Sequence, residues 1–444
     1  MSNSTGPSRA VVVGASIAGL FAGRVLGDFF DEIVLLDKEA LDEGPIPRKA
    51  VPQGNHIHGI LTPTFHVLER FLPDLIDDLI RNGAHMFDGG KDWRFNVHGN
   101  FLANGETGQT LIGSTRPFFE DRLRHVVTGI PNVQIRSGHR FKNWVSADDG
   151  SRIEGVAVDT DDGVVEFNAE LLVDARGRGS TLSKELQDLG YDTPIEELVG
   201  VNLGYTSRLY KAPDFAPEWN LLILNPSAPE SWIGGLIEKV ENQQYIVTQF
   251  GYFGDHAPAD SDGFLERARS LASQEIAEFL TIAEPVSNFK TFGTKQCRMI
   301  RYEKLPEFPE RLVVIGDAVC SLNPIYGQGM TKAAREAEHL WDSLAAHLEQ
   351  NESLDGFSGK LRRSLPGAGA EWAWQLTSGA DLGYPQTTGK RQPIGPFMGW
   401  YMKRLFLSSA KSLDARKRLF DTLMLVNPPD NLFKPGMIRH ALGF

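Results

Sequence analysis

The first 40 residues alternate apolar and glycine-rich stretches in an order that predicts one βαβ unit. Residues 10–26, AVVVGASIAGLFAGRVL, contain a short apolar run, a glycine turn and a run with helical spacing of apolar residues. Residues 32–37, EIVLLD, form a second apolar run that ends in an acidic residue. We therefore expect a buried strand, a helix and a second strand at the start of the chain.

The next stretches change pattern several times. Residues 41–60 are rich in proline and glycine, which predicts a loop. Residues 66–80 and 116–127 each have the apolar spacing of a helix. Alternating apolar and polar residues between 133 and 174 predict β-hairpins that lead back into the first sheet.

The middle of the chain, residues 195–295, has the alternating texture of an antiparallel sheet, followed within it by a helical run at 263–280. Residues 313–334, VVIGDAVCSLNPIYGQGMTKAA, then join an apolar run, a glycine-rich segment and a helix-prone run. Residues from 366 onward are expected to pack as a helical tail.

Composition narrows the class of protein. The 444 residues are 41% hydrophobic and 23% charged, which is typical of a large folded chain. The net charge of −12 argues against a nucleic-acid partner. Two cysteines, Cys297 and Cys320, exclude a disulfide scaffold. No apolar run is long enough for a transmembrane segment, and the chain start lacks a signal-peptide core, so we expect a cytoplasmic protein.

The turn GASIAG, residues 14–19, has the small residues that dinucleotide binding requires. Gly14 permits a tight turn and Gly19 lets helix and strand pack closely, whereas Ser16 replaces the middle glycine. Asp37 follows at about 20 positions, where a carboxylate binds the ribose hydroxyls of an adenosine. The alternative is a glycine turn that binds nothing. The second glycine-rich segment, at 313–334, favours FAD over NAD, because a ribityl chain and a flat ring extend beyond the pyrophosphate.

The segment GDAVCSLNPIYGQGMTKAA resembles the GDAAHxxxPxxGxGxN segment of the group A, or para-hydroxybenzoate hydroxylase-like, FAD monooxygenases. The resemblance implies that Asp317 binds the ribityl chain and that the backbone from Pro324 to Met330 runs along the isoalloxazine. It also implies that the following helix aims its first amides at the pyrimidine edge of the ring. We expect Asp317 to lie deeper in the protein than Asp37.

Further matches extend this resemblance. In LLVDARGRGSTLSKEL, Gly177 and Ser180 match the family segment GADGxxSxxR, but Arg176 replaces the usual Asp. This variant is similar to the DATGR version of flavin epoxidases and prenyl-chain reductases, which leaves a standard pyridine-nucleotide contact open. The resemblance places Arg48 near the flavin and Arg116 in contact with FAD; a surface ion pair is the alternative for each.

The loop RKAVPQGNHIHGIL, residues 48–61, resembles the RxGVPQxxHxHxLL loop of bacterial monooxygenases related to squalene epoxidase and the polyether epoxidases. The stretches GDAVCSLNPIYGQGMT and WQLTSGADLGYP are similar to the same branch. The candidate cofactor-binding residues are Gly14, Ser16, Ile17, Ala18, Gly19, Asp37, Lys38, Arg48, Arg116, Asp317, Pro324, Gly327, Gly329 and Met330.

The expected fold class is α/β, with a Rossmann-type (GR2-like) FAD-binding domain, an inserted antiparallel β-sheet substrate domain and a helical C-terminal tail. The expected ranges are 1–80, 103–194 and 296–365 for a discontinuous FAD-binding domain, 81–102 and 195–295 for the substrate-binding domain, and 366–444 for the C-terminal helical region.

The resemblance implies an FAD-dependent monooxygenase that inserts one oxygen atom from dioxygen, through a flavin hydroperoxide, into an apolar olefinic or aromatic natural-product-like substrate. Epoxidation and hydroxylation both stay open. FAD is expected to be non-covalent and to be reduced by NAD(P)H or by a separate flavin reductase. The alternatives are a flavin-dependent reductase of isoprenoid double bonds and a flavin-dependent halogenase. The W-x-W at Trp372 and Trp374 lacks the Ile-Pro of the halogenase motif, so tail packing is the favoured interpretation.

Trp232, Tyr205 and Tyr252 are candidates to line the substrate pocket, with ordinary core packing as the alternative. No Asp–His or Tyr–Tyr relay is visible near either flavin segment. No catalytic side chain is therefore assigned, and we expect oxygen transfer to depend little on pH between about 6 and 9.

Histidines and a cysteine near the flavin segments offer two further interpretations. His56, His58 and His66 lie close together but lack a neighbouring carboxylate cluster, so no metal site is expected. Cys320 is expected to be a small buried residue beside the flavin.

Overall fold

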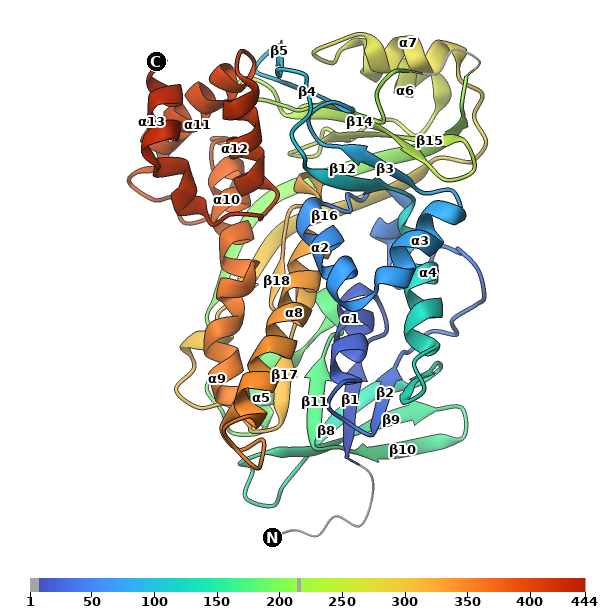
Figure 1. The fold of residues 1–444 in the computed structure, drawn as a ribbon, viewed down its shortest axis with the longest axis vertical. Helices are drawn as coiled ribbons and strands as arrows, with labels where there is room; N and C mark the ends of the chain where they lie inside the picture. Colours follow the sequence, from blue (N-terminus) through green and yellow to red (C-terminus); the bar gives the residue numbers. More distant parts are fainter. Residues whose placement is uncertain (1–7, 214–216, 444) are drawn as a thin grey trace.

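The computed structural model describes residues 8–213 and 217–443, so the predicted domain ranges include residues 1–7, 214–216 and 444 that lie outside this description. A parallel sheet occupies the lower half of the molecule and a larger, mostly antiparallel sheet crosses the upper half (Figure 1). The last helices of the chain stand beside the upper sheet. This arrangement is the α/β fold class that the sequence predicts.

Four of the five strands of the parallel sheet are buried on both faces, whereas the edge strand Val133–Arg136 is partly exposed. Its spatial order is β17 (Leu312–Val314), β11 (Leu171–Asp174), β1 (Arg9–Val13), β2 (Glu32–Leu36) and β7 (Val133–Arg136). The buried strands are mostly apolar because layers cover both sides. Val12 belongs to the core on one face, whereas Val11 and Val13 belong to the core on the other. Strands β1 and β2 pair in parallel and are connected by helix α1 (Ile17–Leu26), which confirms the predicted βαβ unit.

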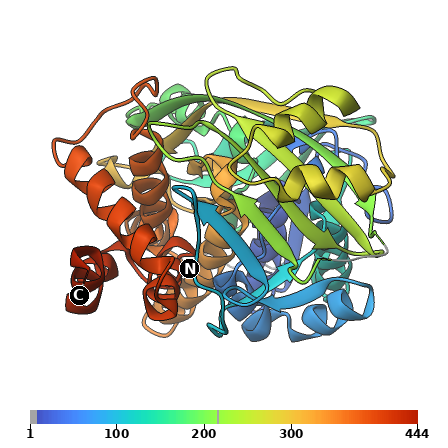
Figure 2. The same ribbon diagram turned by 90° about the horizontal axis from the view of Figure 1, so that it is seen from above.

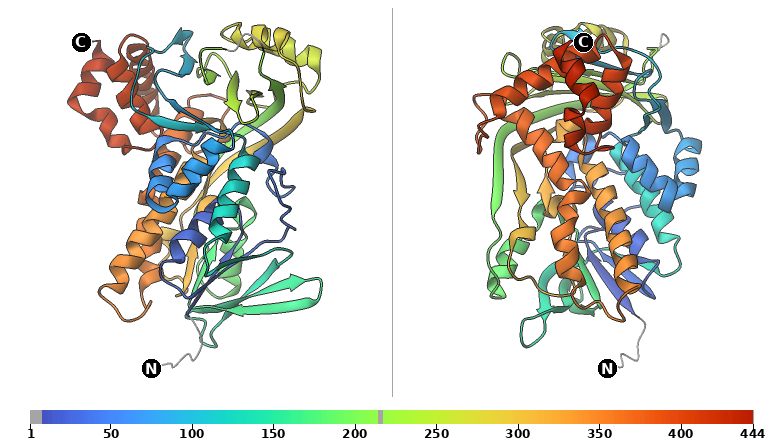
Figure 3. Two further views of the ribbon diagram at one scale, coloured as in Figure 1. Left: turned by 45° about the vertical axis from the view of Figure 1, so that its right-hand side comes forward. Right: turned by 60° about the vertical axis from the view of Figure 1, so that its left-hand side comes forward.

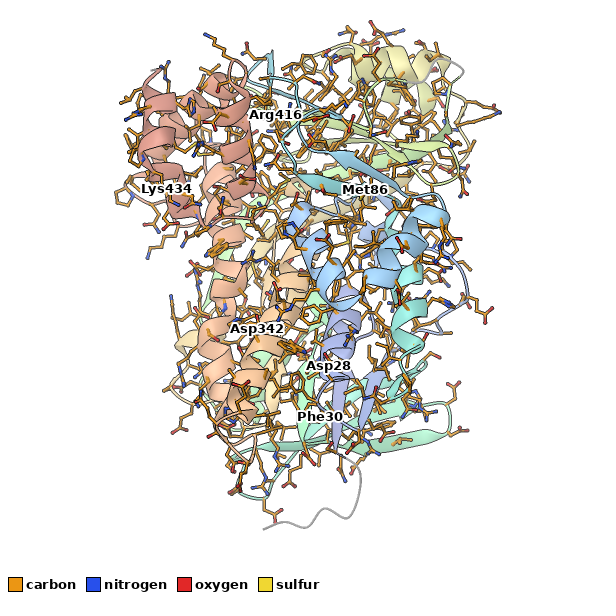
Figure 4. All side chains as sticks on the ribbon, viewed as in Figure 1. Asp28, Phe30, Met86, Asp342, Arg416 and Lys434 are labelled. Carbon is orange, nitrogen blue, oxygen red and sulfur yellow. The ribbon has the colours of Figure 1, made fainter. Side chains whose placement is uncertain are left out.

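Helices α1 and α8 (Gly329–Leu348) pack together on one face of this sheet. At the end of α1, a carboxylate oxygen of Asp28 accepts a hydrogen bond from the indole nitrogen of Trp341 at 2.8 Å. Figure 4 labels Asp28 and also Asp342, the residue that follows Trp341 in the chain. The two helices that begin near the expected cofactor are thus also fixed to each other at their far ends.

A three-stranded antiparallel sheet lies at the base of the molecule (Figure 3). It consists of β8 (Arg140–Ser146), β9 (Ile153–Thr160) and β10 (Gly163–Asn168), which confirms the predicted hairpins.

Arg176 connects this small sheet to the end of β11. Its Nη2 lies 2.7 Å from Asp174 and 2.7 Å from Glu185 on α5 (Leu182–Asp188), and its guanidinium lies 3.7 Å from the ring centre of Phe141 on β8. The arginine that departs from the family pattern therefore fills an internal structural position.

The upper sheet gathers strands from several parts of the chain. Its order is β18 (Cys320–Ser321), β16 (Lys290–Ile300), β12 (Glu196–Lys211), β15 (Gln244–Gly251), β14 (Ile233–Val240), β13 (Leu221–Leu224), β4 (Trp93–Val97) and β5 (Asn100–Phe101). Strand β18 belongs to the second glycine-rich segment and pairs with β16. The sheet that is expected to cover the substrate is thus directly continuous with the expected flavin segment.

Two predicted helical runs are each interrupted. The run at 66–80 forms α2 (Thr62–Phe71) and α3 (Pro73–Arg81), because Pro73 disfavours a helical conformation at Leu72. The run at 263–280 forms α6 (Ser261–Arg269) and α7 (Glu275–Ile282), and Leu271 between them is buried in the same core cluster as both helices. Seen from above, α6 and α7 lie over one face of the upper sheet (Figure 2).

The remaining elements connect or flank these layers. They are the two-stranded sheet β3 (His85–Asp88) and β6 (Thr110–Gly113), the helices α4 (Arg116–Thr128), α9 (Phe357–Ser364), α10 (Ala370–Asp381), α11 (Gly395–Ser409), α12 (Leu413–Leu423) and α13 (Pro435–Leu442), and the short 3₁₀ helices η1 (Pro52–Asn55), η2 (Gly177–Gly179), η3 (Tyr302–Lys304), η4 (Gly316–Ala318), η5 (Pro324–Tyr326), η6 (Leu365–Ala368) and η7 (Pro429–Phe433). Within residues 8–213 and 217–443, no helix combines the length and apolarity needed to span a bilayer.

A buried arginine attaches the carboxy-terminal helices to the upper sheet. Arg416 on α12, labelled in Figure 4, donates to the carbonyl oxygens of Gly89 at 2.8 Å, Trp93 at 2.6 Å and Ala103 at 2.5 Å. Burial lowers the pKa of Arg416 to about 10. Three carbonyl groups thus hold this side chain where a carboxylate would usually pair with it.

We expect Arg176→Met to destabilise the fold by about 3–5 kcal/mol, because methionine keeps the apolar packing but leaves the fully buried Asp174 without its cation. Urea unfolding measures the loss. Arg152→Met is the matched control, since Arg152 pairs with Glu154 at the surface and such pairs contribute about 1 kcal/mol or less. Equal unfolding midpoints for the two variants would contradict the structural role of Arg176.

Candidate functional site

The turn after β1 depends on two glycines whose surroundings leave no room for a side chain. Gly14 has a φ of +110°, and a Cβ there would lie 2.4 Å from the carbonyl oxygen of Ala175. A Cβ on Gly19 would lie 1.7 Å from the carbonyl oxygen of Gly14. Among the described residues, no side chain caps the N-terminus of α1. The amides of Ile17 and Ala18 therefore remain available to an anion.

The acidic residue after β2 is buried and already paired. Oδ2 of Asp37 accepts hydrogen bonds from the backbone nitrogen of Ala15 at 3.0 Å and from Nη2 of Arg48 at 2.7 Å. Nη1 of Arg48 also donates to the carbonyl oxygen of Ala15 at 3.1 Å. The structure therefore places Arg48 against the dinucleotide turn, on the side of Asp37, while the neighbouring side chain of Lys38 is exposed.

A buried carboxylate joins both candidate arginines. Glu120 on α4 lies 2.8 Å from Arg48 and 2.8 Å from Arg116, and Nη2 of Arg116 donates to Oγ of Ser16 at 3.0 Å. Burial acts to raise the pKa of Glu120, but Arg116 and Arg48 outweigh it and hold that pKa below its usual value. The two arginine side chains are only 12% and 9% exposed, which excludes surface ion pairs as their explanation.

The second glycine-rich segment meets the first at the start of α1. Gly316 has a φ of +67°, and a Cβ there would lie 2.8 Å from Cβ of Ala18. Gly177 has a φ of +65°, and its Cβ would lie 3.9 Å from Cβ of Asp317. Three segments that the sequence analysis singled out separately therefore form one site.

A buried pair of charges supports the backbone beside Asp317. Lys332 and Glu336 lie on the first turns of α8 and are fully buried, with Nζ of Lys332 3.6 Å from Glu336 and 3.8 Å from Asp317. The second carboxylate oxygen of Glu336 accepts a hydrogen bond from the backbone nitrogen of Gly316 at 2.6 Å. These contacts hold the segment that contains Gly316 and Asp317 against α8.

The backbone between Pro324 and Met330 is open on one side. Gly327 adopts a left-handed conformation with a φ of +65°, and Gly329 begins α8 at a position where a Cβ would meet no described atom within 4 Å. Met330 is buried in the core beneath. No described side chain caps α8, so its first amides can face the anionic edge of a ring.

These features fit FAD. The uncapped start of α1 suits a pyrophosphate, and Arg116, which donates to Ser16 at this start, also lines a small hollow with Arg48 and Glu120. The uncapped start of α8, with bare backbone in front of it, suits the ring.

The relative depth expected for the two acids is wrong. The side chain of Asp37 is 6% exposed, whereas that of Asp317 is 35% exposed. The reason is that Arg48, from the loop after β2, folds over Asp37 and pairs with it. Asp317 instead borders the open backbone on which a ligand would lie.

The sequence analysis missed a buried carboxyl group, Asp381, at the end of α10. Its Oδ1 accepts hydrogen bonds from the hydroxyls of Tyr252 at 2.9 Å and Tyr326 at 2.8 Å, and from Nδ2 of Asn323 at 2.9 Å. Burial raises the pKa of Asp381 to about 7, although these three donors act to lower it. Asn323 and Tyr326 belong to one of the flavin segments, so this hydrogen-bonded group, which is not visible in the linear sequence, lies beside that segment.

No local signal in the sequence could have revealed this group. Asp381 lies in an unremarkable helix, and its partners are 55 to 129 residues away in the chain. Only the stretch containing Asp381, WQLTSGADLGYP, had been noted, for its similarity to one family branch.

The face of the upper sheet that looks toward the flavin segments is aromatic with a few polar points. Tyr205 on β12 is buried opposite Phe250 on β15, and its ring centre lies 5.5 Å from that of His56. Nδ1 of His56 lies 2.6 Å from Oγ of Ser207. Burial lowers the pKa of His56 to about 4, so this ring is neutral.

The other candidates that the sequence offered lie elsewhere or in the core. Trp232 is 36% exposed, and its indole nitrogen donates to Asp255, so it does not resemble a pocket wall. Trp374 is buried and donates to Glu197, as expected for tail packing. Burial raises the pKa of Cys320, which leaves it a neutral thiol.

The three histidines are not gathered around a common point in the way a metal site requires. Nδ1 of His58 bonds to the carbonyl oxygen of His56 at 2.9 Å. Across residues 8–213 and 217–443, no group of three or more His, Cys, Asp or Glu side chains is arranged to hold a metal ion.

Comparisons with known proteins agree with this geometry. A sequence model of the family described as FAD binding domain matches residues 103–364. Protein Rv3254 of Mycobacterium tuberculosis is 31% identical over 403 residues, which cover 86% of this chain and 82% of that protein. Para-nitrophenol 4-monooxygenase of a Pseudomonas species is 25% identical over 393 residues, which cover 83% of this chain and 87% of the relative.

A solved structure of the flavin-dependent brominase Bmp2 superimposes with a TM-score of 0.69 and covers 98% of both chains. Its sequence identity of 16% limits this likeness to the fold.

We expect Asp37→Ala and Asp317→Ala to separate stability from cofactor binding. Asp37→Ala should lower the unfolding free energy of the FAD-free protein by about 1–3 kcal/mol, because the backbone amide of Ala15 and Nη2 of Arg48 lose their acceptor, while Glu39 and Glu120 still pair with Arg48. Asp317→Ala should leave this stability nearly unchanged but weaken FAD binding about tenfold or more, through loss of a charge-assisted hydrogen bond. Thermal unfolding and FAD titration of both FAD-free variants measure the two effects. Parallel losses in both assays would contradict this division of roles.

We expect Asp381→Asn to stabilise the protein increasingly as pH rises. The carboxyl of Asp381 has a pKa of about 7 in the fold, above its unfolded value, so the folded state binds more protons and stability falls between about pH 4 and 7. Asparagine removes this loss, which amounts to roughly 4 kcal/mol once pH exceeds 7. Urea unfolding at pH 5 and 8 measures it, with the exposed Asp430→Asn as control. A variant that tracks the unmodified protein at both pH values would rule out the shifted carboxyl.

Proposed function

Because the chain belongs to the family of para-hydroxybenzoate hydroxylase-like FAD-dependent monooxygenases, we propose that it inserts one oxygen atom from dioxygen into an apolar aromatic or olefinic small molecule. When bound, FAD supplies the redox and oxygen-transfer chemistry. The observation that carries the proposal is the meeting of the Gly14 turn and the Gly316 segment at the start of α1.

The residues of the two segments have separate roles in this proposal. The first amides of α1 and Arg116 bind the pyrophosphate, and Asp37 binds the adenosine ribose. Asp317 binds the ribityl chain, while the start of α8 stabilises negative charge at the edge of the ring. Binding is non-covalent, which the neutral, buried Cys320 supports.

The substrate lies between this site and the aromatic face of the upper sheet. The side chains of that face are largely apolar and include Tyr205, Phe250 and Phe292. Such a face favours a substrate with an aromatic or olefinic carbon skeleton. The relative that acts on para-nitrophenol supports hydroxylation, and the VPQGNHIHGIL loop supports epoxidation by its similarity to squalene-epoxidase-like enzymes. Electrons come from NAD(P)H or from a separate flavin reductase.

We expect the FAD-loaded protein, supplied with NADPH, NADH or chemically reduced flavin, to add one oxygen atom to a phenolic or olefinic test substrate. Mass spectrometry under ¹⁸O₂ should show one labelled oxygen per product, because dioxygen is the source. A product that gains two hydrogens without dioxygen would indicate a reductase, and a bromide-dependent product would indicate a halogenase.

Two matched glycine substitutions control this assay. Gly329→Val places a side chain where the ring is proposed to lie, while a Cβ there meets no described atom within 4 Å, so the fold should persist. Its activity should fall about 100-fold, because displacement of a reacting group by about 1 Å has that effect. Gly399→Val makes the same change on α11, also in open space, and should retain activity. Equal activities would contradict the proposed position of the ring.

A further inference from the structure

Aromatic side chains gather in exposed positions on the C-terminal helices. Phe397 and Trp400 on α11 and Phe433 at the end of η7 are each between 46% and 51% exposed. The ring centres of Phe397 and Phe433 lie 6.1 and 5.5 Å from that of Tyr401, and both rings stack on it. Phe397 also lies 5.7 Å from Trp400. We call Phe397, Trp400 and Phe433, which form one cluster around Tyr401, the aromatic patch.

Exposed apolar side chains continue this surface along both neighbouring helices. Ile394 precedes α11, and Ile438 and Leu442 lie four residues apart on α13, so the latter two share one face of that helix. Helices α11 and α13 pack against each other, with Nε of Arg404 donating to the carbonyl oxygen of Ala441 at 2.8 Å. Isolated apolar residues are common on protein surfaces, but a group of them on adjacent helices indicates an interaction site.

The same part of the chain carries an excess of positive charge. Residues 390–444 contain ten lysines and arginines, three aspartates and no glutamate, so their formal net charge is +7. The whole chain has a net charge of −12, which leaves −19 for residues 1–389. The C-terminal helices therefore have a charge opposite in sign to that of the remaining molecule.

Several of these cations are adjacent in the chain to the exposed apolar residues. Lys434 follows Phe433 and is labelled on the outer side of the C-terminal helices in Figure 4. In the described chain, the exposed Lys390, Lys434 and Arg439 have no carboxylate within 4 Å, whereas Arg418 pairs with an aspartate of its own helix. Their long side chains can keep their methylene groups in apolar surroundings while the charged ends reach an anionic group.

The combination of rings and cations indicates which partner this surface fits. Half-exposed aromatic rings suit the boundary between lipid headgroups and acyl chains, and lysine and arginine suit anionic headgroups. A second copy of the chain is disfavoured, because a two-fold contact would bring two positive surfaces together. A nucleic acid would attract the cations but would leave Ile394, Ile438 and Leu442 without an apolar partner.

We propose that the outer side of α11 and α13 docks on an anionic lipid bilayer. The aromatic patch enters the headgroup region, and Lys390, Lys434 and Arg439 bind the anionic headgroups around it. The helices lie along the membrane surface, and only their side chains enter it. Docking uses no residue of the FAD site, so it does not rest on the proposed function.

The test measures flotation of the FAD-loaded full chain with lipid vesicles in a density gradient. One set of vesicles contains one part phosphatidylserine to two parts phosphatidylcholine, and the other contains phosphatidylcholine alone. We expect about 100-fold tighter binding to the anionic vesicles, because each of three cations near such a surface contributes a factor of about five. Added salt should weaken this binding, since it screens the charges.

Matched variants locate the contact. Trp400→Ser and Ile394→Ser should each weaken binding about tenfold, because apolar area no longer leaves water. Ile282→Ser on α7 is the control for Ile394→Ser, since the two side chains are 62% and 59% exposed and α7 lies on the other side of the upper sheet (Figure 1). Lys434→Glu should weaken binding to anionic vesicles at least about tenfold, whereas Lys290→Glu on β16 should not. Retained FAD absorption and an unchanged unfolding midpoint show that each variant is folded.

Equal binding to the two kinds of vesicle would overturn the proposal, and so would unchanged binding of both Trp400→Ser and Lys434→Glu. Failure to bind either kind of vesicle would overturn it in favour of a protein partner. Self-association without vesicles that Trp400→Ser abolishes, measured by sedimentation, would assign the surface to a second copy instead. Because the assay involves no oxidation, its outcome is independent of whether the oxygen-insertion assay succeeds.

Discussion

The site depends on backbone that approaches backbone without any side chain between. At Gly14, Gly19 and Gly316 a single methyl group would lie between 1.7 and 2.8 Å from a neighbouring atom. Substitution at Gly316 would separate it from Ala18, and with it the two segments that are proposed to hold opposite ends of FAD, whereas substitution at Gly14 or Gly19 would distort the first turn itself. Glycine loses more conformational freedom on folding than other residues, and the close approach offsets this loss by exposing helix amides to a ligand.

The buried charges follow two different rules. Arg48, Arg116 and Arg176 each have a carboxylate partner within 2.8 Å, so these pairs remain ionised and serve to fix backbone positions. Asp381 has only neutral partners and therefore titrates near neutrality. The arginine pairs therefore keep their charges near neutral pH, whereas the charge of this one carboxyl group depends on pH.

The sequence predicted the elements whose signal is local. Adjacent apolar residues and glycines encode the first strand, turn and helix. The segment around Gly316 has the same kind of local pattern, so the sequence predicted both segments. Pro73 is a local signal for a helix boundary, but the helical spacing of the residues around it predicted one uninterrupted helix. Asp381 could not be found in this way, because its hydrogen bonds join residues of β15, η5 and α10 that only the folded chain brings together. The relative exposure of Asp37 and Asp317 likewise depends on the folded chain, because the loop that carries Arg48 covers Asp37 but not Asp317.

The anchoring of α12 by Arg416 has a consequence for biosynthesis. The three carbonyl groups that Arg416 binds precede it by 313 to 327 residues, so they are synthesised long before their donor. Until α12 leaves the ribosome, this edge of the upper sheet lacks both its hydrogen-bond donor and its apolar cover. A nascent chain therefore completes this edge only at the end of translation. Before that point the uncovered apolar surface of the edge is available to chaperones.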